Sequence, residues 1–156
     1  MNIDTTADEL VSNQVPVFRV ELVCERVWNG PVVASPEQVA RVACEYLKRA
    51  DREHFIVLLL ATNCRLIGVN TAHVGSLAAS VVRVADVFKA AILANAASVV
   101  FAHNHPSNNL EPSQEDLRVT RRLVEAGRLL DVPVLDHLIT GHDGRYTSLA
   151  ERGLLG

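Results

Sequence analysis

Apolar and polar residues follow regular periods from about residue 15 onward. Residues 16–23 alternate apolar and polar types, which is the period of a half-buried strand. Dense apolar runs at 53–61 and 65–70, separated by Thr62-Asn63-Cys64, predict an antiparallel hairpin. Apolar residues on both faces of the first run place it centrally in a sheet. Shorter runs at 98–102, 132–139 and 145–149 predict further strands.

Three stretches have the helical period. Residues 35–50 predict a helix with Ser35 as N-cap and Pro36 at the first helical position. Residues 80–95 are apolar nearly all round and predict a mostly buried helix, and a third helix is expected to begin at Ser113 and run to about residue 130. Helices interspersed with strands predict an α/β fold in which helices flank a mixed β-sheet.

The length of 156 residues suits one compact domain and is short for two. Residues 1–14 are polar and unpatterned, so we expect a flexible N-terminal tail there and a single domain over residues 15–156. The first nine residues carry acidic rather than basic groups, which does not match a secretory signal, and we expect a cytoplasmic protein. The longest apolar run, 55–61, is far below the ~18 residues of a membrane helix.

Charge and cysteine content narrow the function classes. Fifteen Lys and Arg against 18 Asp and Glu give a net charge of −3, so the chain lacks the positive excess that neutralises phosphates. General nucleic-acid binding is therefore not supported by charge. Cys24, Cys44 and Cys64 are odd in number and far apart, without a paired zinc or redox motif. We expect three free thiols, buried or half-buried, in a reducing compartment.

The chemistry of the chain is concentrated between residues 103 and 116. His103 and His105 stand two residues apart at the end of a predicted buried strand, so their side chains project to the same side. A proline-bounded loop, residues 106–112, has room to turn the chain back and bring Asp116 near both imidazoles. Two nitrogen ligands and one oxygen ligand leave a fourth position for water, which is the coordination of a catalytic zinc.

Each part of this pattern also has a structural interpretation. Ser113-x-x-Asp116 before a helical period is a capping box, and taken alone that role is the more common one. A lone His-x-His is weak as a metal signal. The combination favours a metal site, and the two roles of Asp116 are compatible because a capped first turn would fix its carboxylate.

His103-x-His105, seven residues, Ser113, two residues and Asp116 resemble the H-x-H-x7-S-x2-D core of the JAMM motif of MPN/JAB metalloproteases. The surrounding residues resemble the RadC family, whose JAB domain bears a historical DNA-repair label: His-Asn-His-Pro-Ser at 103–107, Pro-Ser at 112–113 and Leu-Asp-His-Leu-Ile at 135–139. The resemblance covers about residues 50–150. It implies a cytidine-deaminase-like α/β/α architecture of the JAB/MPN type, a zinc site and an amide or isopeptide hydrolase.

The resemblance also implies individual roles. The JAMM pattern has a glutamate on an earlier strand, and Glu53 fits because it stands immediately before the apolar run 55–60. Glu53 would take a proton from the attacking water, and Ser113 would donate a hydrogen bond to the oxyanion. The implied enzyme is a zinc metallopeptidase or isopeptidase with a peptide or protein substrate. Glu21, Glu25 and Glu45 lie outside the resemblance and are weaker candidates.

Other functions remain open at this point. A zinc nucleoside deaminase would share the architecture, but its H-x-E and P-C-x-x-C signature is absent. A metal-dependent nuclease or DNA-repair protein fits the family's label and predicts DNA cleavage or salt-sensitive DNA binding, which the acidic balance does not favour. A non-catalytic interaction module, as in MPN relatives that have lost their ligands, is disfavoured by the intact ligands.

Two further positions give local expectations. Asn108 stands where the RadC family usually has glycine, and asparagine tolerates a left-handed backbone better than most residues. Asp136 and His137 are neighbours on a predicted strand and point to opposite faces, so they cannot both enter one site. We expect a structural role, with one of them hydrogen-bonded at the rim of the sheet.

Overall fold

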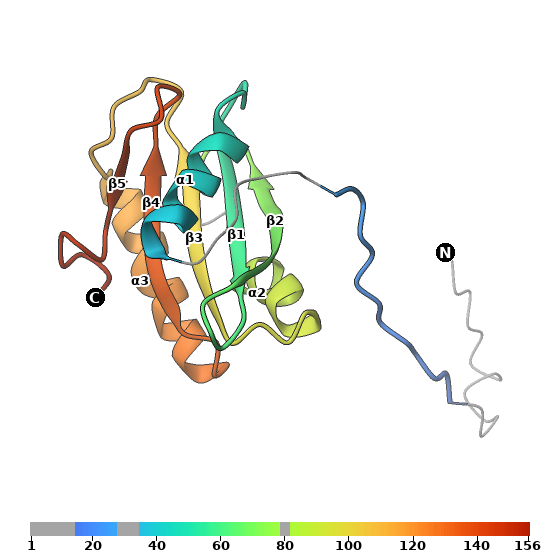
Figure 1. The fold of residues 1–156 in the computed structure, drawn as a ribbon. Coiled ribbons are helices and arrows are strands. Elements are labelled where there is room, and N and C mark those ends of the chain that lie inside the picture. The colour runs from blue at the N-terminus through green and yellow to red at the C-terminus, as the bar shows by residue number, and fades with distance from the viewer. Residues whose placement is uncertain (1–14, 28–34, 79–81) are drawn as a thin grey trace, which may run out of the picture.

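In the computed structural model, which describes residues 15–27, 35–78 and 82–156, a five-stranded sheet has helices on both faces (Figure 1). The strand order is β2-β1-β3-β4-β5, and only the β3–β4 pair is parallel. This mixed sheet confirms the predicted α/β class. None of the helices in the described ranges has the length and hydrophobicity needed to cross a membrane. The elements in chain order are α1 (Pro36–Leu47), β1 (His54–Leu60), β2 (Leu66–Val74), α2 (Val84–Leu93), β3 (Ser98–Asn104), α3 (Gln114–Leu129), β4 (Val134–Thr140) and β5 (Tyr146–Ser148).

Side-chain alternation along β1 and β3 builds two cores, one on each face of the sheet. Phe55, Val57 and Leu59 of β1 pack with residues of α2 and α3, whereas the even-numbered residues between them pack under α1. The same holds on β3, where Val99 and Phe101 face the α3 side. The same alternation places residue 103, two positions after Phe101, on the α3 side of the sheet, where the candidate metal site lies.

Helix boundaries follow local chemistry. Ser35 is the N-cap of α1 and Pro36 begins it, as predicted, but the helix ends at Leu47 rather than near residue 50. The helix expected from residue 80 begins at Val84, because Arg83 has an extended backbone. Val82 is nevertheless only 3% exposed and belongs to the α3-side core. This apolar residue, which fits the helical pattern in the sequence, is therefore buried in the segment that precedes α2.

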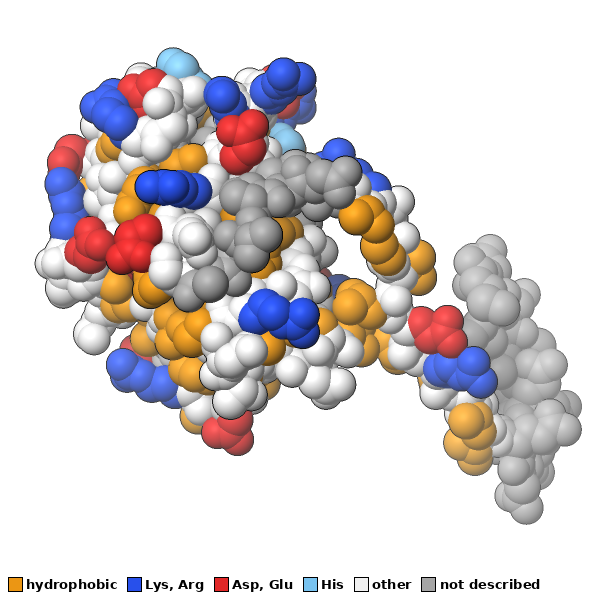
Figure 2. Space-filling view, viewed as in Figure 1, with side chains coloured by type: hydrophobic (Ala, Val, Ile, Leu, Met, Phe, Trp, Pro, Cys, Tyr) orange, Lys and Arg blue, Asp and Glu red, His pale blue; other side chains and the backbone are white. Residues whose placement is uncertain are grey.

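The prediction of a half-buried strand at residues 16–23 is wrong. Residues 15–27 form neither strand nor helix; Figure 1 shows them running away from the sheet, and in Figure 2 part of the chain stands apart from the main body of the molecule. Phe18 is 82% exposed and Val20 is 70% exposed. Alternation gives a strand only where another strand supplies its hydrogen bonds, and no described strand does so here. The predicted tail, residues 1–14, lies outside the described residues.

All three cysteines are free, but only Cys44 is buried, whereas Cys24 and Cys64 are exposed. The expectation of buried or half-buried thiols is therefore wrong for two of them. Burial raises the pKa of the Cys44 thiol to about 11, and the thiolate is the reactive form.

We expect iodoacetamide at pH 8 to alkylate Cys24 and Cys64 promptly and Cys44 only slowly. Alkylation of Cys44 should rise as the pH approaches about 11, because the thiolate fraction grows as pH passes through the raised pKa. A mass-spectrometric time course measures this, with denatured protein as the control in which all three sites react. Prompt alkylation of Cys44 in folded protein at pH 8 would contradict the expectation.

Candidate metal centre

Strand pairing and side-chain alternation bring the donor residues to one end of the sheet. Phe55 pairs with His103 between the antiparallel strands β1 and β3. Extending that register by two residues brings Glu53, just before β1, level with His105. Asp116 lies in the first turn of α3, which begins on the same side of the sheet. Glu53, His103, His105 and Asp116 therefore converge, and their candidate ligand atoms all lie within 4.8 Å of one another.

The three donors named first by the sequence form the tightest part of this cluster. His103 Nε2 lies 3.0 Å from His105 Nε2 and 3.3 Å from one oxygen of Asp116. His105 Nε2 lies 3.4 Å from the other oxygen. Ligands at the Zn–N and Zn–O lengths of about 2.0–2.2 Å stand about 3.3–3.5 Å apart in a tetrahedron. The donor types and the two histidine–carboxylate spacings thus fit a zinc ion held by these three side chains, and the two histidine nitrogens would have to move apart by about 0.3 Å.

The capping box fixes the Asp116 carboxylate. The Ser113 backbone N–H and hydroxyl each donate to Oδ2 of Asp116 at 2.7 Å, and the Asp116 N–H donates back to the Ser113 hydroxyl at 3.1 Å. The capping role and the position beside the histidines coexist. Because the Ser113 hydroxyl proton points to Asp116 here, donation to an oxyanion would require that proton to rotate.

A buried chain of hydrogen bonds sets the tautomer of His103. The Thr120 hydroxyl donates to the Asp116 carbonyl at 2.6 Å, so its oxygen accepts from Nδ1 of His137, also at 2.6 Å. The other ring nitrogen of His137 then accepts from Nδ1 of His103 at 2.8 Å. Nε2 of His103 is left with a free lone pair that faces the cluster. Outer partners of this kind orient metal-binding histidines and fix their tautomers.

The pKa shifts of the cluster residues follow from their burial and from their hydrogen bonds to one another. Desolvation lowers the pKa of His137 well below its usual value, and a proton on His103 would lower it further, so His137 is neutral as the chain requires. Burial by itself would raise the pKa of Asp116, but the hydrogen bonds that His103 and His105 donate when they are protonated, together with the one from Ser113, outweigh it and hold that pKa far below its ordinary range. The hydrogen bond to Asp116 raises the pKa of His105 despite partial burial. Asp116 is therefore ionised and offers a carboxylate to a cation.

Hydrogen bonds outside the cluster also fix the positions of His105 and Glu53. Nδ1 of His105 donates to the Asn109 carbonyl at 2.5 Å, so Nε2 is the atom that faces the cluster. The buried Asn104 side chain accepts from the His54 N–H at 2.8 Å and donates to the Arg52 carbonyl at 2.9 Å. These two bonds bracket Glu53 and tie its backbone to the end of β3.

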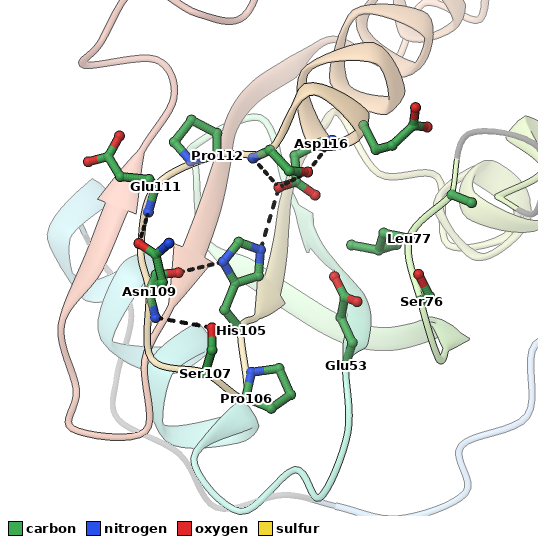
Figure 3. A pocket seen from close by; sticks show the side chains of 13 residues that line it. Glu53, Ser76, Leu77, His105, Pro106, Ser107, Asn109, Glu111, Pro112 and Asp116 are labelled. Carbon is green, nitrogen blue, oxygen red and sulfur yellow. Dashed lines mark hydrogen bonds and ion pairs between the residues drawn. The ribbon is translucent and has the colours of Figure 1, made fainter.

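Three of the donors, Glu53, His105 and Asp116, line a cleft of about 590 Å³, and His103 is buried behind them. Figure 3 shows the carboxylate of Glu53 and the ring of His105 turned toward the same space, with Ser76 and Leu77 on the facing wall. Asn108 on the loop beside the cleft has φ +60°, so the asparagine takes the left-handed backbone that the sequence allowed. The lining residues are Glu53, Ser76, Leu77, Ala78, His105, Pro106, Ser107, Asn109, Glu111, Pro112, Ser113, Glu115 and Asp116.

The sequence did not indicate that Asn104, Thr120 and His137 support the site, although it predicted a structural role for Asp136 and His137 with one of them hydrogen-bonded at the rim of the sheet. Asp136 and His137 do point to opposite faces, and Asp136 accepts from Ser148 and from the Ala150 N–H. His137, however, is fully buried behind His103 and not at the rim. The parallel register of β3 and β4, which pairs Phe101 with His137, places it there. Nothing in the sequence specified that register.

Replacing His137 by phenylalanine is expected to weaken zinc affinity about 10–100-fold, the usual effect of losing an outer partner of a ligand. Phenylalanine keeps a ring in the core but removes both nitrogens, leaving Nδ1 of His103 without an acceptor. Competition with a chromogenic chelator measures the affinity. The exposed His142, replaced by phenylalanine, is the control, and equal affinity in the two variants would show that His137 does not support the site.

Comparison with known proteins gives a consistent match. The family model of the RadC-like JAB domain matches residues 33–154. A UPF0758 protein of Chloroflexus aggregans is 47% identical over 122 residues, covering 78% of this chain and 53% of that protein. A UPF0758 protein of Moorella thermoacetica is 48% identical over 124 residues, covering 80% of this chain and 54% of that protein. The chain spans about half the length of the curated relatives it matches.

Proposed function

Because the chain belongs to the RadC-like JAB domain family and brings four metal-binding side chains together at one cleft, we propose that it is a zinc-dependent hydrolase of peptide or isopeptide bonds. The observation that carries the proposal is the spacing of His103, His105 and Asp116, which suits zinc, with Glu53 beside them. The three closest groups would hold the ion and the fourth would act on water.

A zinc ion at this position would supply Lewis acidity and lower the pKa of a coordinated water to about 7. The residues of the chain then do the rest. Glu53 accepts the proton from the attacking water and delivers it to the leaving amine. Ser113, at the edge of the same cleft, rotates its hydroxyl toward the oxyanion of the tetrahedral intermediate. The reaction forms no covalent bond between enzyme and substrate.

The composition of the cleft favours a peptide over a nucleic acid. Among the described lining residues four are acidic and none is lysine or arginine. Although Arg152 pairs with Glu111 and Arg118 with Glu115, Glu53 and Asp116 remain as negative groups beside the histidines. Phosphate groups would meet repulsion there, since nucleic-acid sites neutralise phosphates with basic side chains. A peptide carries no such charge along its backbone.

The test compares metal content with activity on defined probes. Protein purified without chelator and loaded with Zn²⁺ would be incubated with a proteome-derived peptide library, with an isopeptide-linked lysine peptide, and with single- and double-stranded DNA. We expect about one bound zinc per chain and new termini in a peptide or isopeptide probe only. DNA cleavage would favour the nuclease instead, and bound zinc without cleavage of any probe would favour a non-catalytic module.

A further inference from the structure

Residues 15–27 are strand-like in sequence but have no partner among the described strands. On an extended backbone, Phe18, Val20 and Leu22 share one face, and the other face carries Arg19 and Glu21 at its centre with a valine at each end. Arg19 Nη1 lies 3.1 Å from Glu21 Oε1, which confirms that the two charged groups point to the same side. The three apolar residues of the first face are more than half exposed. Isolated exposed apolar residues are ordinary, but a whole apolar face on one extended segment marks an interaction surface.

The sequence around Val20 is self-complementary. In an antiparallel pair of identical strands centred on Val20, each residue faces the one equally far on the other side of the centre. Arg19 of one chain then faces Glu21 of the other, and Phe18 faces Leu22. Val17 faces Val23 one step further out. Opposite charges and apolar pairs directly across a ladder are the contacts that stabilise antiparallel strands.

We propose that residues 16–24 pair with the same residues of a second copy of this chain, forming an antiparallel ribbon with its two-fold axis at Val20. Charge complementarity favours a second copy of this chain as the partner. In a two-fold symmetric pair, Arg19 of each chain lies opposite Glu21 of the other, which makes two ion pairs between the chains. The pairing also gives both strands backbone hydrogen-bond partners and gathers six apolar side chains on one face. A two-stranded ribbon alone is marginal, so the dimer should be weak and concentration-dependent.

Charge swaps test the pairing directly. Arg19→Glu leaves one chain with two acidic groups on the polar face, and Glu21→Arg leaves another with two basic groups. Each variant alone would place like charges opposite each other twice, which should weaken dimerisation at least about 10-fold. The two variants mixed would place acid opposite base at every charged position and should form a heterodimer. The double variant should dimerise like the parent.

Sedimentation velocity over a concentration series gives the dimerisation constants, and native mass spectrometry identifies the heterodimer in the mixture. If the segment paired instead with the sheet of its own chain, the double variant could also regain its contacts. Mixing the two single variants, however, would then not restore them. A parent chain that stays monomeric at high concentration, single variants that dimerise fully, or a mixture without heterodimer would each overturn the proposal. Circular dichroism confirms that the variants fold.

Cross-linking tests the register independently. In a Cys24→Ser, Cys64→Ser background, Val20→Cys places two thiols across the two-fold axis, where the Cα spacing of about 4.5–5.5 Å in an antiparallel pair permits a disulfide. Phe18→Cys is the matched control, because residue 18 faces residue 22 of the other chain and not its own copy. Mild oxidation should cross-link the first variant much faster than the second. Equal rates would overturn the register.

Discussion

Replacing Glu53 by glutamine is expected to lower the rate of peptide or isopeptide hydrolysis about 10²–10⁴-fold while the zinc content stays at the parent's level. Glutamine keeps the size of the side chain and one carbonyl oxygen but cannot take a proton from water. The three closest donors, His103, His105 and Asp116, are unaffected. Initial rates on the probe that the parent cleaves, together with zinc analysis of the same samples, measure both quantities.

Glu45→Gln is the matched control for this change. Glu45 lies on α1, across the sheet from the cleft, and is exposed beside Lys48. Its replacement should leave both rate and zinc content unchanged. Hydrolysis retained in Glu53→Gln would remove Glu53 from the proposed role, and a loss of zinc in that variant would reassign Glu53 as a direct ligand.

His103→Ala is expected to reduce zinc affinity by more than about 100-fold and to abolish hydrolysis with it. Loss of an outer partner costs 10–100-fold, so removal of a ligand itself should exceed that range. His103 is fully buried and is the ligand that the buried histidine chain supports. Zinc bound per chain after dialysis, together with the competition assay, checks the affinity whatever the substrate proves to be.

His105→Ala separates loss of the metal from loss of the fold. His103 packs in the core beside Phe55, so its removal also leaves a cavity that can destabilise the protein. The His105 side chain lies at the edge of the cleft and is 16% exposed, so its loss disturbs packing less. Both variants should lose zinc. Stoichiometric, tightly bound zinc in a folded His105→Ala protein would contradict the assigned ligand set.

Much of this fold and site followed from local pattern. The continuous apolar run along β1, with apolar residues on both faces, predicted a central strand, and the Ser113 capping box predicted where α3 begins. His103, His105 and Asp116 were recognisable because two residues on one strand side and one residue in a first helical turn need only local geometry to meet. Glu53 needed the family resemblance, because one carboxylate before a strand has no distinguishing spacing of its own.

The remaining features depend on long-range pairing or on a partner. The position of His137 is set by the parallel register of β3 and β4, and that of Asn104 by the antiparallel register of β1 and β3. Neither register can be read from a periodic pattern. At residues 16–23 the sequence pattern was strong but the predicted strand did not form. A strand there would need a neighbouring strand to pair with, and the described residues do not supply one.

The hydrogen bonds of the Asn104 amide bear on the order in which the parts of the site come together during folding. The amide joins the end of β3 to backbone fifty residues earlier in the chain, and contacts that distant form late. Because His103, His105 and Asp116 need only local geometry to meet, a partly folded chain can bring these three together while Glu53 is still apart from them. Glu53 should therefore join the cluster only when β1 pairs with β3, and an ion held by the other three groups would add to the stability of the folded chain.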